Sequence, residues 1–192
     1  MRYPLITITG PSGSGKTTVA QEMQTRGFLE ATSTTTRNPR PGEEHGKDYY
    51  FVNPDEFQRQ EDDGGFLEVV EFSGNRYGIT RAEIEKKTVK APTLVVVDGH
   101  GAEQILATCV PPSEDAPLLR VYLDLHPAHA KARMLSRGDS AEAVEKRAAH
   151  DKGKFSAWKQ EIQWDLLIYN HRSKRTVDLI EFFVRQYHPE LT

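Results

Sequence analysis

Four apolar runs along the chain predict the buried strands of a parallel sheet. Each run is short and rich in β-branched residues, and they cover 3–9, 93–98, 119–124 and 165–170, a pattern typical of strands covered on both faces. Helices are expected between or after these strands, at about 16–26, 101–107, 127–137, 140–152 and 174–186. Such an alternation predicts an α/β fold, a three-layer sandwich in which helices cover both faces of a parallel central sheet.

Two segments interrupt this alternation. Residues 33–80 contain candidate strands at 48–52 and 66–72, several turns and a short helix that begins near Asn53, which together predict a small, mostly β insertion. Residues 133–154 have a helical pattern and are rich in charge; a solvated pair of amphipathic helices is the ordinary explanation of such a charge run. The remaining residues, 1–32, 81–132 and 155–192, are expected to form the core.

Composition adds a few limits. The chain has 192 residues, 37% of them hydrophobic and 28% charged, and a net charge of −3. These values suit one compact soluble unit and give no general reason to expect a nucleic-acid polymer or a membrane as a partner. Neither a signal sequence nor an apolar run of bilayer-spanning length is recognisable. Cys109, the only cysteine, excludes an intramolecular disulfide and is expected to be a small buried residue in a cytoplasmic protein.

A glycine-rich motif between the first expected strand and the first expected helix predicts a phosphate-binding loop. It matches G-x-x-x-x-G-K-[ST] in the strand–loop–helix setting that this motif requires. The residues assigned to the ATP site are Gly10, Pro11, Ser12, Gly13, Ser14, Gly15, Lys16, Thr17 and Thr18. The glycines let backbone N–H groups point at phosphate oxygens, and the helix N-terminus adds partial positive charge. Lys16 is expected to bridge the β- and γ-phosphates of ATP, and Thr17 to offer its hydroxyl to Mg²⁺.

Outside this loop, two groups of residues are candidates for binding an anion or a metal. Arg37 and Arg40 are followed by Tyr49 and form a possible phosphate clamp, because arginine recognises phosphate through paired hydrogen bonds. Two arginines at this spacing are, taken alone, usually surface charge. Asp98 ends the strand at 93–98 and is a candidate ligand for Mg²⁺, directly or through water, although a strand-end aspartate is often only a helix cap.

Taken together, the motifs of this chain closely resemble guanylate kinase. The resemblance covers nearly the whole chain. It rests on GPSGSGKT at 10–17, S-x-T-T-R-x-P-R-x-G-E at 33–43, G-x-D-Y-x-F-V at 46–52, F-L-E at 66–68, G-N-x-Y-G at 74–78 and the late strand that ends in Asn170. It implies a P-loop NTPase fold, in which 33–80 is the subdomain that binds the acceptor nucleoside monophosphate and 133–154 is a lid.

The resemblance also implies roles for individual residues. The side chains of Arg37, Arg40, Tyr49 and Tyr77 would hold the phosphate of the acceptor, and those of Ser33 and Glu68 would face its base. A carboxylate can accept hydrogen bonds from both N1–H and N2–H₂ of guanine, whereas adenine offers no such pair of donors. Read without the resemblance, the alternation around Glu68 also allows an outward-facing strand residue.

Three arginines lie in the second insertion. Arg133 and Arg137 are four residues apart and therefore share one helix face, and Arg147 follows. The resemblance implies that this lid closes over ATP and that its arginines, with Lys16 and Arg37, neutralise the transferring phosphoryl group. Phosphoryl transfer depends mainly on positioning and charge stabilisation, so no general base is expected.

The chain departs from the family pattern near the acceptor base. Ile79 stands where the family has a hydroxyl residue that binds the base, and Thr80 is the nearest substitute. Val96 replaces the first carboxylate of a family Asp-x-Asp, which leaves Asp98 as the carboxylate expected to contribute to acceptor binding. His100 replaces a glutamine, and the lid is one residue short.

The sequence predicts a kinase that transfers a phosphoryl group from Mg-ATP to GMP or dGMP. Free nucleotides are the expected partners, and the expected oligomeric state is a monomer or a weak homodimer. Four alternatives remain open: a kinase of a modified or different nucleoside monophosphate, a kinase of a phosphorylated ribose, a non-catalytic interaction module, and an enzyme acting on nucleotides within a polymer.

Overall fold

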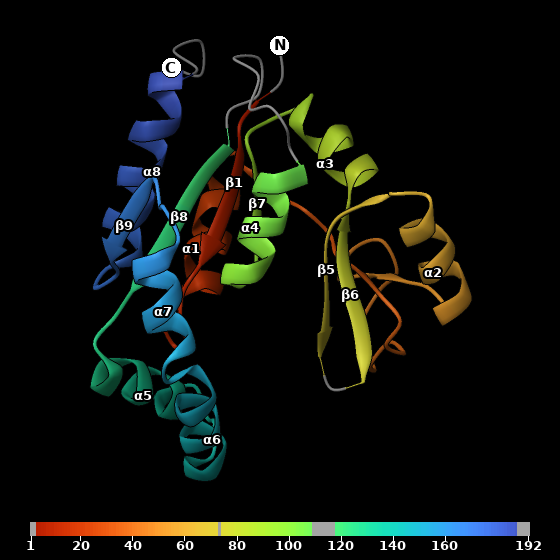
Figure 1. Cartoon of the computed structure of the whole chain (residues 1–192). Coiled ribbons are helices and arrows are strands. Elements are labelled where there is room, and N and C mark those ends of the chain that lie inside the picture. The colour runs from red at the N-terminus through yellow and green to blue at the C-terminus, as the bar shows by residue number, and fades with distance from the viewer. Residues whose placement is uncertain (1–2, 73, 109–117, 188–192) are drawn as a thin grey trace.

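A five-stranded parallel sheet forms the centre of the protein (Figure 1). The computed structural model describes residues 3–72, 74–108 and 118–187, so Cys109 lies outside the described residues. The strand order is β2-β7-β1-β8-β9. The strands are β1 Leu5–Thr9, β2 Leu29–Glu30, β7 Thr93–Val96, β8 Leu118–Asp124 and β9 Leu166–Tyr169. The four strands expected from the apolar runs are confirmed, whereas the two-residue β2 is too short to produce a recognisable pattern.

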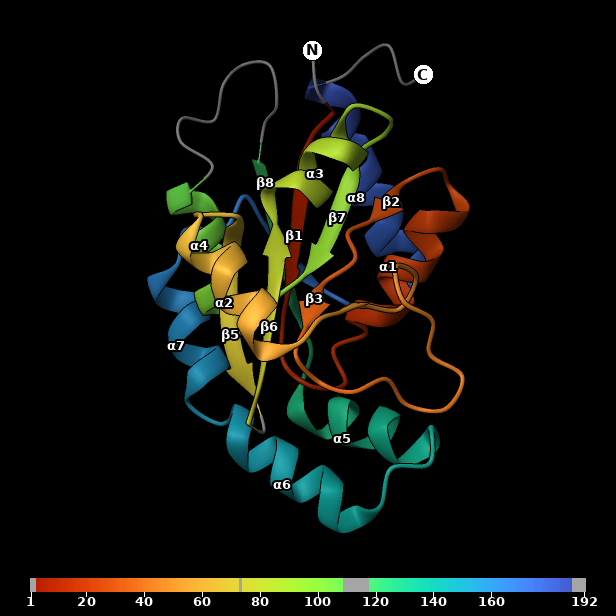
Figure 2. The ribbon, with the colours of Figure 1, turned by 90° about the vertical axis from the view of Figure 1, so that its right-hand side faces the viewer.

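Helices cover both faces of this sheet (Figure 2). On one face, α1 (Lys16–Thr25) and α8 (Ser173–Tyr187) bury Met23 and Ile180 completely against strand residues such as Ile6. On the other face lie α4 (Gly99–Thr108) and α7 (Lys154–Glu161). The expected three-layer α/β sandwich is therefore confirmed, with α7 as an additional helix that the sequence pattern did not predict.

Aromatic side chains hold α7 on the sheet. The Tyr122 hydroxyl donates to the Phe155 carbonyl at 2.9 Å, and the Tyr122 ring lies 5.2 Å from the Trp164 ring. Trp158 packs so closely on Gly99 that a Cβ at position 99 would lie 2.3 Å from the indole. Glycine is therefore the residue that lets α7 and the start of α4 approach each other.

The segment after β2 folds into a second, smaller sheet. Its strands are β3 Thr34–Thr35, β4 Tyr50–Phe51, β5 Phe66–Phe72 and β6 Asn75–Thr80, in the order β4-β3-β6-β5. The helix α2 (Pro54–Asp62) begins where expected, because the Asn53 side chain accepts from the Glu56 N–H at 2.8 Å. Phe57 of α2 is fully buried and stacks on Phe66 at 4.4 Å. The expected strand at 48–52 is wrong in length: residues 46–48 form a turn, Tyr49 makes an isolated bridge with His45, and Tyr50 and Phe51 are the residues that pair with β3.

A short helix that was not predicted, α3 (Arg81–Thr88), joins the small sheet to β7. Its buried Glu83 accepts hydrogen bonds from the Thr32 N–H at 3.0 Å and from the Tyr50 hydroxyl at 3.1 Å, and it pairs with Lys87 at 2.7 Å. These contacts fix the base of the small sheet against the core.

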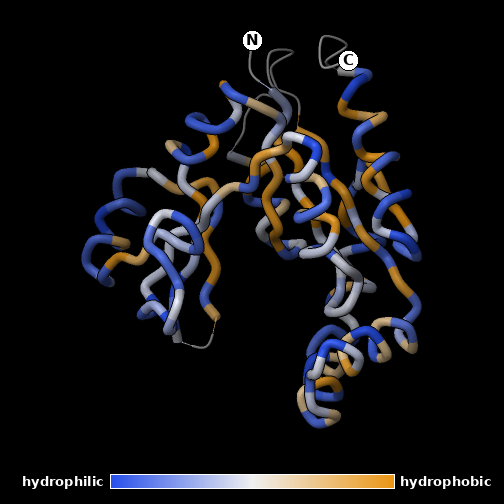
Figure 3. The backbone as a smooth tube through the Cα atoms, turned by 180° about the vertical axis from the view of Figure 1, so that it is seen from behind, coloured by the Kyte–Doolittle hydropathy of each residue, from blue (hydrophilic) through white to orange (hydrophobic). Residues whose placement is uncertain are grey.

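Two helices extend beyond the carboxyl ends of the core strands (Figures 1 and 3). They are α5 (Pro127–Ser136) and α6 (Ala141–Asp151), and both were expected from the sequence. Figure 3 shows the apolar strands at the centre of the molecule and the mixed polarity of α6 away from it. In the described part of the chain, no helix combines the length and apolar character needed to cross a membrane.

Candidate active site

The glycine-rich loop connects the carboxyl end of β1 to the first turn of α1. Gly15 has φ +95°, and a Cβ there would lie 2.6 Å from Nδ2 of Asn170. That amide group, buried at the end of β9, donates to the Ser14 carbonyl at 2.7 Å, and its Oδ1 accepts from the Thr176 hydroxyl at 2.8 Å. Asn170 therefore supports the loop from behind, a role that the sequence motif did not indicate.

The Lys16 ammonium is folded onto its own loop in this structure. Its Nζ donates to the carbonyls of Gly10 at 2.6 Å and Pro11 at 3.0 Å. Burial lowers the Lys16 pKa to about 8, while the nearby carboxylate of Asp151 opposes this change and the positive charge of Arg137 adds to it.

The three arginines of the segment 133–154 and the glycine-rich loop line one cavity of about 440 Å³. Arg133 donates to the carbonyls of Asn170 at 2.9 Å and His171 at 3.0 Å. Arg137 and Arg147 both donate to Oδ2 of Asp139, at 2.6 Å and 3.1 Å. The Arg137 hydrogen bond is the main cause of a lowered Asp139 pKa. The cavity is lined by Ser12, Gly13, Gly15, Lys16, Thr17, Thr18, Arg133, Ser136, Arg137 and Arg147.

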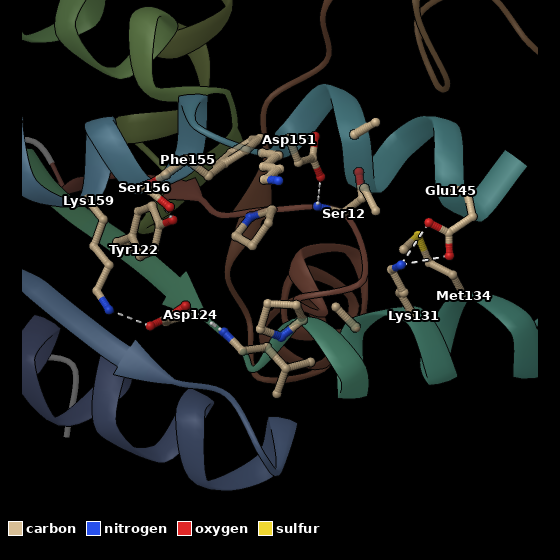
Figure 4. A pocket seen from close by; sticks show the side chains of 17 residues that line it. Ser12, Tyr122, Asp124, Lys131, Met134, Glu145, Asp151, Phe155, Ser156 and Lys159 are labelled. Carbon is tan, nitrogen blue, oxygen red and sulfur yellow. Dashed lines mark hydrogen bonds and ion pairs between the residues drawn. The ribbon is translucent and has the colours of Figure 1, made fainter.

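A larger cavity of about 640 Å³ adjoins the other side of Ser12, between β8, α5, α6 and α7 (Figure 4). Oδ2 of Asp151, the last residue of α6, accepts from the Ser12 N–H at 2.6 Å. At the opposite end of the cavity, Asp124 pairs with Lys159 at 2.6 Å. Neither carboxylate lies in a recognisable motif, so neither was expected from the sequence to have a role in the site.

Residues expected to hold the acceptor phosphate meet on the small sheet and the loop between β3 and β4. The Arg37 guanidinium lies 5.4 Å from the centre of the Tyr49 ring, and the Tyr49 and Tyr77 rings are 6.0 Å apart. Arg37 also pairs with Glu43 at 2.8 Å, and the backbone N–H of Arg40 donates to the same carboxylate at 2.7 Å. The hydrogen bond from Arg37 is the main cause of a lowered Glu43 pKa. The side chain of Arg40 is exposed beside this cluster.

Glu68 lies on β5 and faces the N-terminus of α4. It is only 6% exposed, so the alternative of an outward-facing strand residue is wrong. Burial, and to a lesser extent the negative charge of Asp98, raise the Glu68 pKa to about 7, while the Ile79 N–H opposes the shift. A Cβ at Gly101 would lie 3.3 Å from Oε2 of Glu68, and the Gly101 N–H donates to Oδ1 of Asp98 at 2.9 Å. Asp98 thus caps α4 beside the buried carboxylate.

The positions that depart from the family pattern have other contacts. Ile79 is fully buried in an apolar cluster with Leu67 and Ile105, rather than presenting a hydrogen-bonding group. The Thr80 hydroxyl accepts from the Glu83 N–H at 3.2 Å and caps α3. Ser33, Tyr49 and Val96 line a further cavity of about 640 Å³ between the small sheet and the core. His100 is exposed in the first turn of α4.

The oxygen ligands expected for Mg²⁺ lie at the carboxyl ends of the neighbouring strands β1 and β7. Thr17 is exposed in the first turn of α1, and the Thr9 hydroxyl donates to the Val97 carbonyl at 3.1 Å, which ties the loop to the Asp98 segment. Hydroxyl and carboxylate oxygens are suitable ligands for a hard cation. Among residues 3–72, 74–108 and 118–187, no group of three or more His, Cys, Asp or Glu side chains is arranged to hold a metal ion.

Comparisons with known proteins agree with this geometry. The profile of the guanylate kinase family matches residues 2–187. Guanylate kinase from Streptomyces kasugaensis is 35% identical over 181 residues, covering 88% of this chain and 80% of that protein. The Homo sapiens guanylate kinase is 33% identical over 173 residues, covering 86% of this chain and 84% of that protein. The crystal structure of guanylate kinase from Anaplasma phagocytophilum superposes with a TM-score of 0.65 at 27% identity, covering 96% of this chain and 86% of that one. The chain therefore belongs to the guanylate kinase family.

Proposed function

We propose that this protein transfers the terminal phosphoryl group of ATP to GMP or dGMP. An oxygen of the acceptor phosphate forms a bond to the γ-phosphorus while the bond to the ADP oxygen breaks, giving ADP and GDP or dGDP. The family to which the chain belongs consists of enzymes of this kind, ATP:nucleoside monophosphate phosphotransferases. The buried carboxylate of Glu68 is the observation that carries the assignment to guanine.

The donor half of the reaction is assigned to the phosphate loop. Backbone N–H groups of residues 10–18 bind the phosphates, and the Lys16 ammonium leaves the carbonyls of Gly10 and Pro11 to bridge them. Arg133, Arg137 and Arg147 then stabilise the charge that develops on the transferring group. This assignment is supported by the single cavity that the loop and the three arginines line.

The acceptor half is assigned to the small sheet. Arg37 and Arg40 bind the acceptor phosphate together with the hydroxyls of Tyr49 and Tyr77, and Arg37 exchanges its ion pair with Glu43 for the phosphate. The clustering of Arg37, Tyr49 and Tyr77 supports this role. Of the remaining acceptor candidates, Ser33 faces the base, and Asp98 helps to bind the acceptor beside Glu68. Thr80 helps to bind it only if its hydroxyl gives up the hydrogen bond by which it caps α3.

Guanine selectivity follows from the burial of Glu68. A carboxylate that has lost its water accepts from the two adjacent donors of guanine and regains its hydrogen bonds. An adenine in the same place offers no such pair, so the buried charge stays unsatisfied, at a cost of about 1–3 kcal/mol. Because Ile79 is apolar and offers no hydroxyl to the base, Glu68 is the main determinant of base selectivity in this assignment.

We assign the three parts of the chain accordingly. Residues 33–80 form the acceptor-binding subdomain, 133–154 form the lid, and 1–32, 81–132 and 155–192 form the core. Thr17 and Asp98 would hold the Mg²⁺ that accompanies ATP, Asp98 directly or through water. When bound, the ion neutralises charge on the phosphate oxygens. The enzyme acts on free nucleotides in the cytoplasm, as a monomer or a weak homodimer.

The test is a steady-state assay of the eight common nucleoside and deoxynucleoside monophosphates with Mg-ATP. GMP and dGMP are expected to give the highest kcat/KM, and Glu68→Gln is expected to reduce their advantage over AMP. Absence of turnover with both guanine nucleotides would refute the assignment. Turnover of another base alone would identify a different nucleotide kinase, and ATP binding without any turnover would identify an interaction module.

A further inference from the structure

The carboxylate of Glu83 joins two segments of the chain that carry acceptor candidates. It belongs to α3, where the small sheet meets the core (Figure 1), and the residue is 3% exposed. Its Oε1 accepts from the Thr32 N–H at 3.0 Å, and its Oε2 accepts from the Tyr50 hydroxyl at 3.1 Å. Thr32 directly precedes Ser33, the candidate for the base, and Tyr50 directly follows Tyr49, a candidate for the phosphate. One buried side chain therefore holds both segments.

The strand pairing between these segments is short. β3 and β4 pair in parallel over two residues each, and the Tyr50 N–H also donates to the Ser33 carbonyl at 2.9 Å. So short a ladder supplies few hydrogen bonds, and parallel pairing is slightly less stable per residue than antiparallel pairing. The Glu83 carboxylate adds a bridge outside the ladder. It fixes the backbone just before Ser33 and the side chain of the residue whose N–H binds the Ser33 carbonyl.

Two lysines of α3 balance and orient this buried carboxylate. Lys87 pairs with Glu83 at 2.7 Å, and its Nζ also donates to the Thr32 hydroxyl at 3.3 Å. The Lys86 ammonium donates to the Tyr50 hydroxyl at 3.3 Å, which leaves the hydroxyl proton for Glu83. Burial acts to raise the Glu83 pKa, but the hydrogen bonds from Lys87 and the Thr32 N–H outweigh it, and the pKa is lowered. Hydrogen bonds to an ionised carboxylate are stronger than those to a neutral group.

From these contacts we infer that Glu83 is a positioning residue of the acceptor site, which sets Ser33 and Tyr49 in the geometry that receives the nucleoside monophosphate. It acts through Thr32 and Tyr50. Groups that are already held in place lose less freedom when a ligand binds, so the affinity for the acceptor is higher. The inference rests on the proposed function, because it takes the small sheet and its loops as the acceptor-binding segment. Donor binding belongs to the glycine-rich loop and should not depend on Glu83.

Steady-state constants of Glu83→Gln and Tyr50→Phe, compared with those of the wild type, test the inference. Glutamine keeps the size of the side chain but has an amide donor in place of one acceptor oxygen, so its single oxygen cannot occupy both positions. The KM for GMP is expected to rise about tenfold, the equivalent of one hydrogen bond, and the KM for ATP to stay within about twofold. Tyr50→Phe removes one hydroxyl and keeps the Glu83–Lys87 ion pair, and it should raise the KM for GMP about threefold.

A double variant separates positioning from general damage. If the Tyr50 hydroxyl acts through Glu83, the combined substitutions should raise the KM for GMP no further than Glu83→Gln alone, because the shared contact is already lost. Glu85→Gln is the matched control, since it makes the same substitution on the exposed side of α3. Both of its KM values should stay within about twofold of wild type, as is usual for surface substitutions.

Hydrogen exchange gives a readout that needs no turnover. The amides of 33–35 and 50–52 should exchange faster in Glu83→Gln than in the wild type, because the bridge between their segments is weakened. The amides of β1, in the centre of the core sheet, should exchange at the same rate in both proteins.

Two outcomes overturn the inference. One is a Glu83→Gln protein that is folded by thermal melting and has the wild-type KM for GMP; if this variant does not fold, an unchanged KM in Tyr50→Phe is decisive instead. The other is an equal rise in the KM values for GMP and ATP, which would show general destabilisation. A wild type without turnover of GMP or dGMP would refute the proposed acceptor. The same comparison is then made with the monophosphate that it does phosphorylate, and the exchange measurement is unaffected.

Discussion

The side chain of Gln104 bonds both backbone groups of Val69. Its Oε1 accepts from the Val69 N–H at 2.9 Å, and its Nε2 donates to the Val69 carbonyl at 3.3 Å. Val69 follows Glu68 on β5, the edge strand of the small sheet, and Gln104 belongs to α4 of the core. One side chain of the core therefore pairs with the edge strand as a neighbouring strand would, and it fixes the backbone next to the buried carboxylate.

Replacing Gln104 by leucine is expected to impair recognition of the base more than use of the donor. The Val69 backbone groups lose their partner, and Glu68 is no longer held at the start of α4. We expect the KM for GMP to rise about tenfold, corresponding to the loss of a buried hydrogen bond, with little change in the KM for ATP. The preference for GMP over AMP should fall as well. Gln160→Leu, on the exposed surface of α7, is the control, and an equal rise in both KM values would argue for general destabilisation.

The pH dependence of acceptor binding should follow the ionisation of the Glu68 carboxyl group. Its pKa is raised from 4.5 to about 7 by burial and by Asp98, so the carboxylate that accepts from guanine predominates only above that pH. The KM for GMP should therefore fall as the pH rises from 6 to 8. Glu68→Gln should lose this pH dependence, and a KM that changes identically in both proteins would contradict the role of Glu68.

The same shift has a consequence for stability. Between pH 4.5 and about 7 the folded protein binds more protons at Glu68 than the unfolded chain does. The free energy of unfolding should therefore decrease as the pH rises through this range. Denaturant titrations of wild type and Glu68→Gln measure the difference, and the wild type should show the steeper decrease.

Donor binding should weaken at alkaline pH because of Lys16. Burial lowers its pKa to about 8, so the ammonium that would attract phosphate is progressively lost above that pH. The Kd for ATP is expected to increase from pH 8 to 9.5, whereas the KM for GMP should not follow the same curve. Lys16→Met should remove most of the affinity at every pH, and retention of pH-dependent ATP binding in this variant would exclude Lys16 as the cause.

Asn170→Ala tests the support behind the phosphate loop. The variant removes the shorter of the two hydrogen bonds to the buried Ser14 carbonyl, leaving the 3.4 Å contact from Arg133, and it removes the acceptor of the Thr176 hydroxyl. This should lower the free energy of unfolding by about 1–3 kcal/mol. ATP affinity should fall too, because the loop backbone is less well fixed. Thr176→Val is the control: it removes the second hydrogen bond of Asn170 while the contact to Ser14 remains. Equal losses of ATP affinity in both variants would show that the contact to the loop is not decisive.

Local patterns along the chain account for the core and the phosphate loop. Strands such as β1 and β8 are buried on both faces and therefore appear as continuous apolar runs, and the loop has fixed residues at fixed spacing. In contrast, α3 contains few apolar residues, with Ile84 among its buried positions, and β3 pairs over only two residues. Neither produces a periodic signal, so tertiary contacts decide their structure.

The same distinction holds for the site. Lys16, Arg37 and Glu68 lie in motifs, and their neighbours in sequence identify them. Asp151 and Gln104 contribute through contacts with residues far away in the chain, and a carboxylate or amide on a solvated helix has no local feature that reveals such a partner. Only the folded arrangement brings Asp151 to Ser12 or Gln104 to Val69.

Because Trp158 packs on Gly99, intrinsic tryptophan fluorescence can report on this part of the protein without an added label. The chain contains two tryptophans. Trp158 lies in α7, the helix that begins directly after Gly153, and Trp164 lies just beyond that helix against Tyr122. Indole emission therefore comes from α7 and the residues just after it, next to the proposed lid, while the proposed acceptor subdomain at 33–80 contributes none. Stopped-flow fluorescence of the unlabelled enzyme can thus measure the rate at which the surroundings of α7 respond to ATP, separately from their response to GMP.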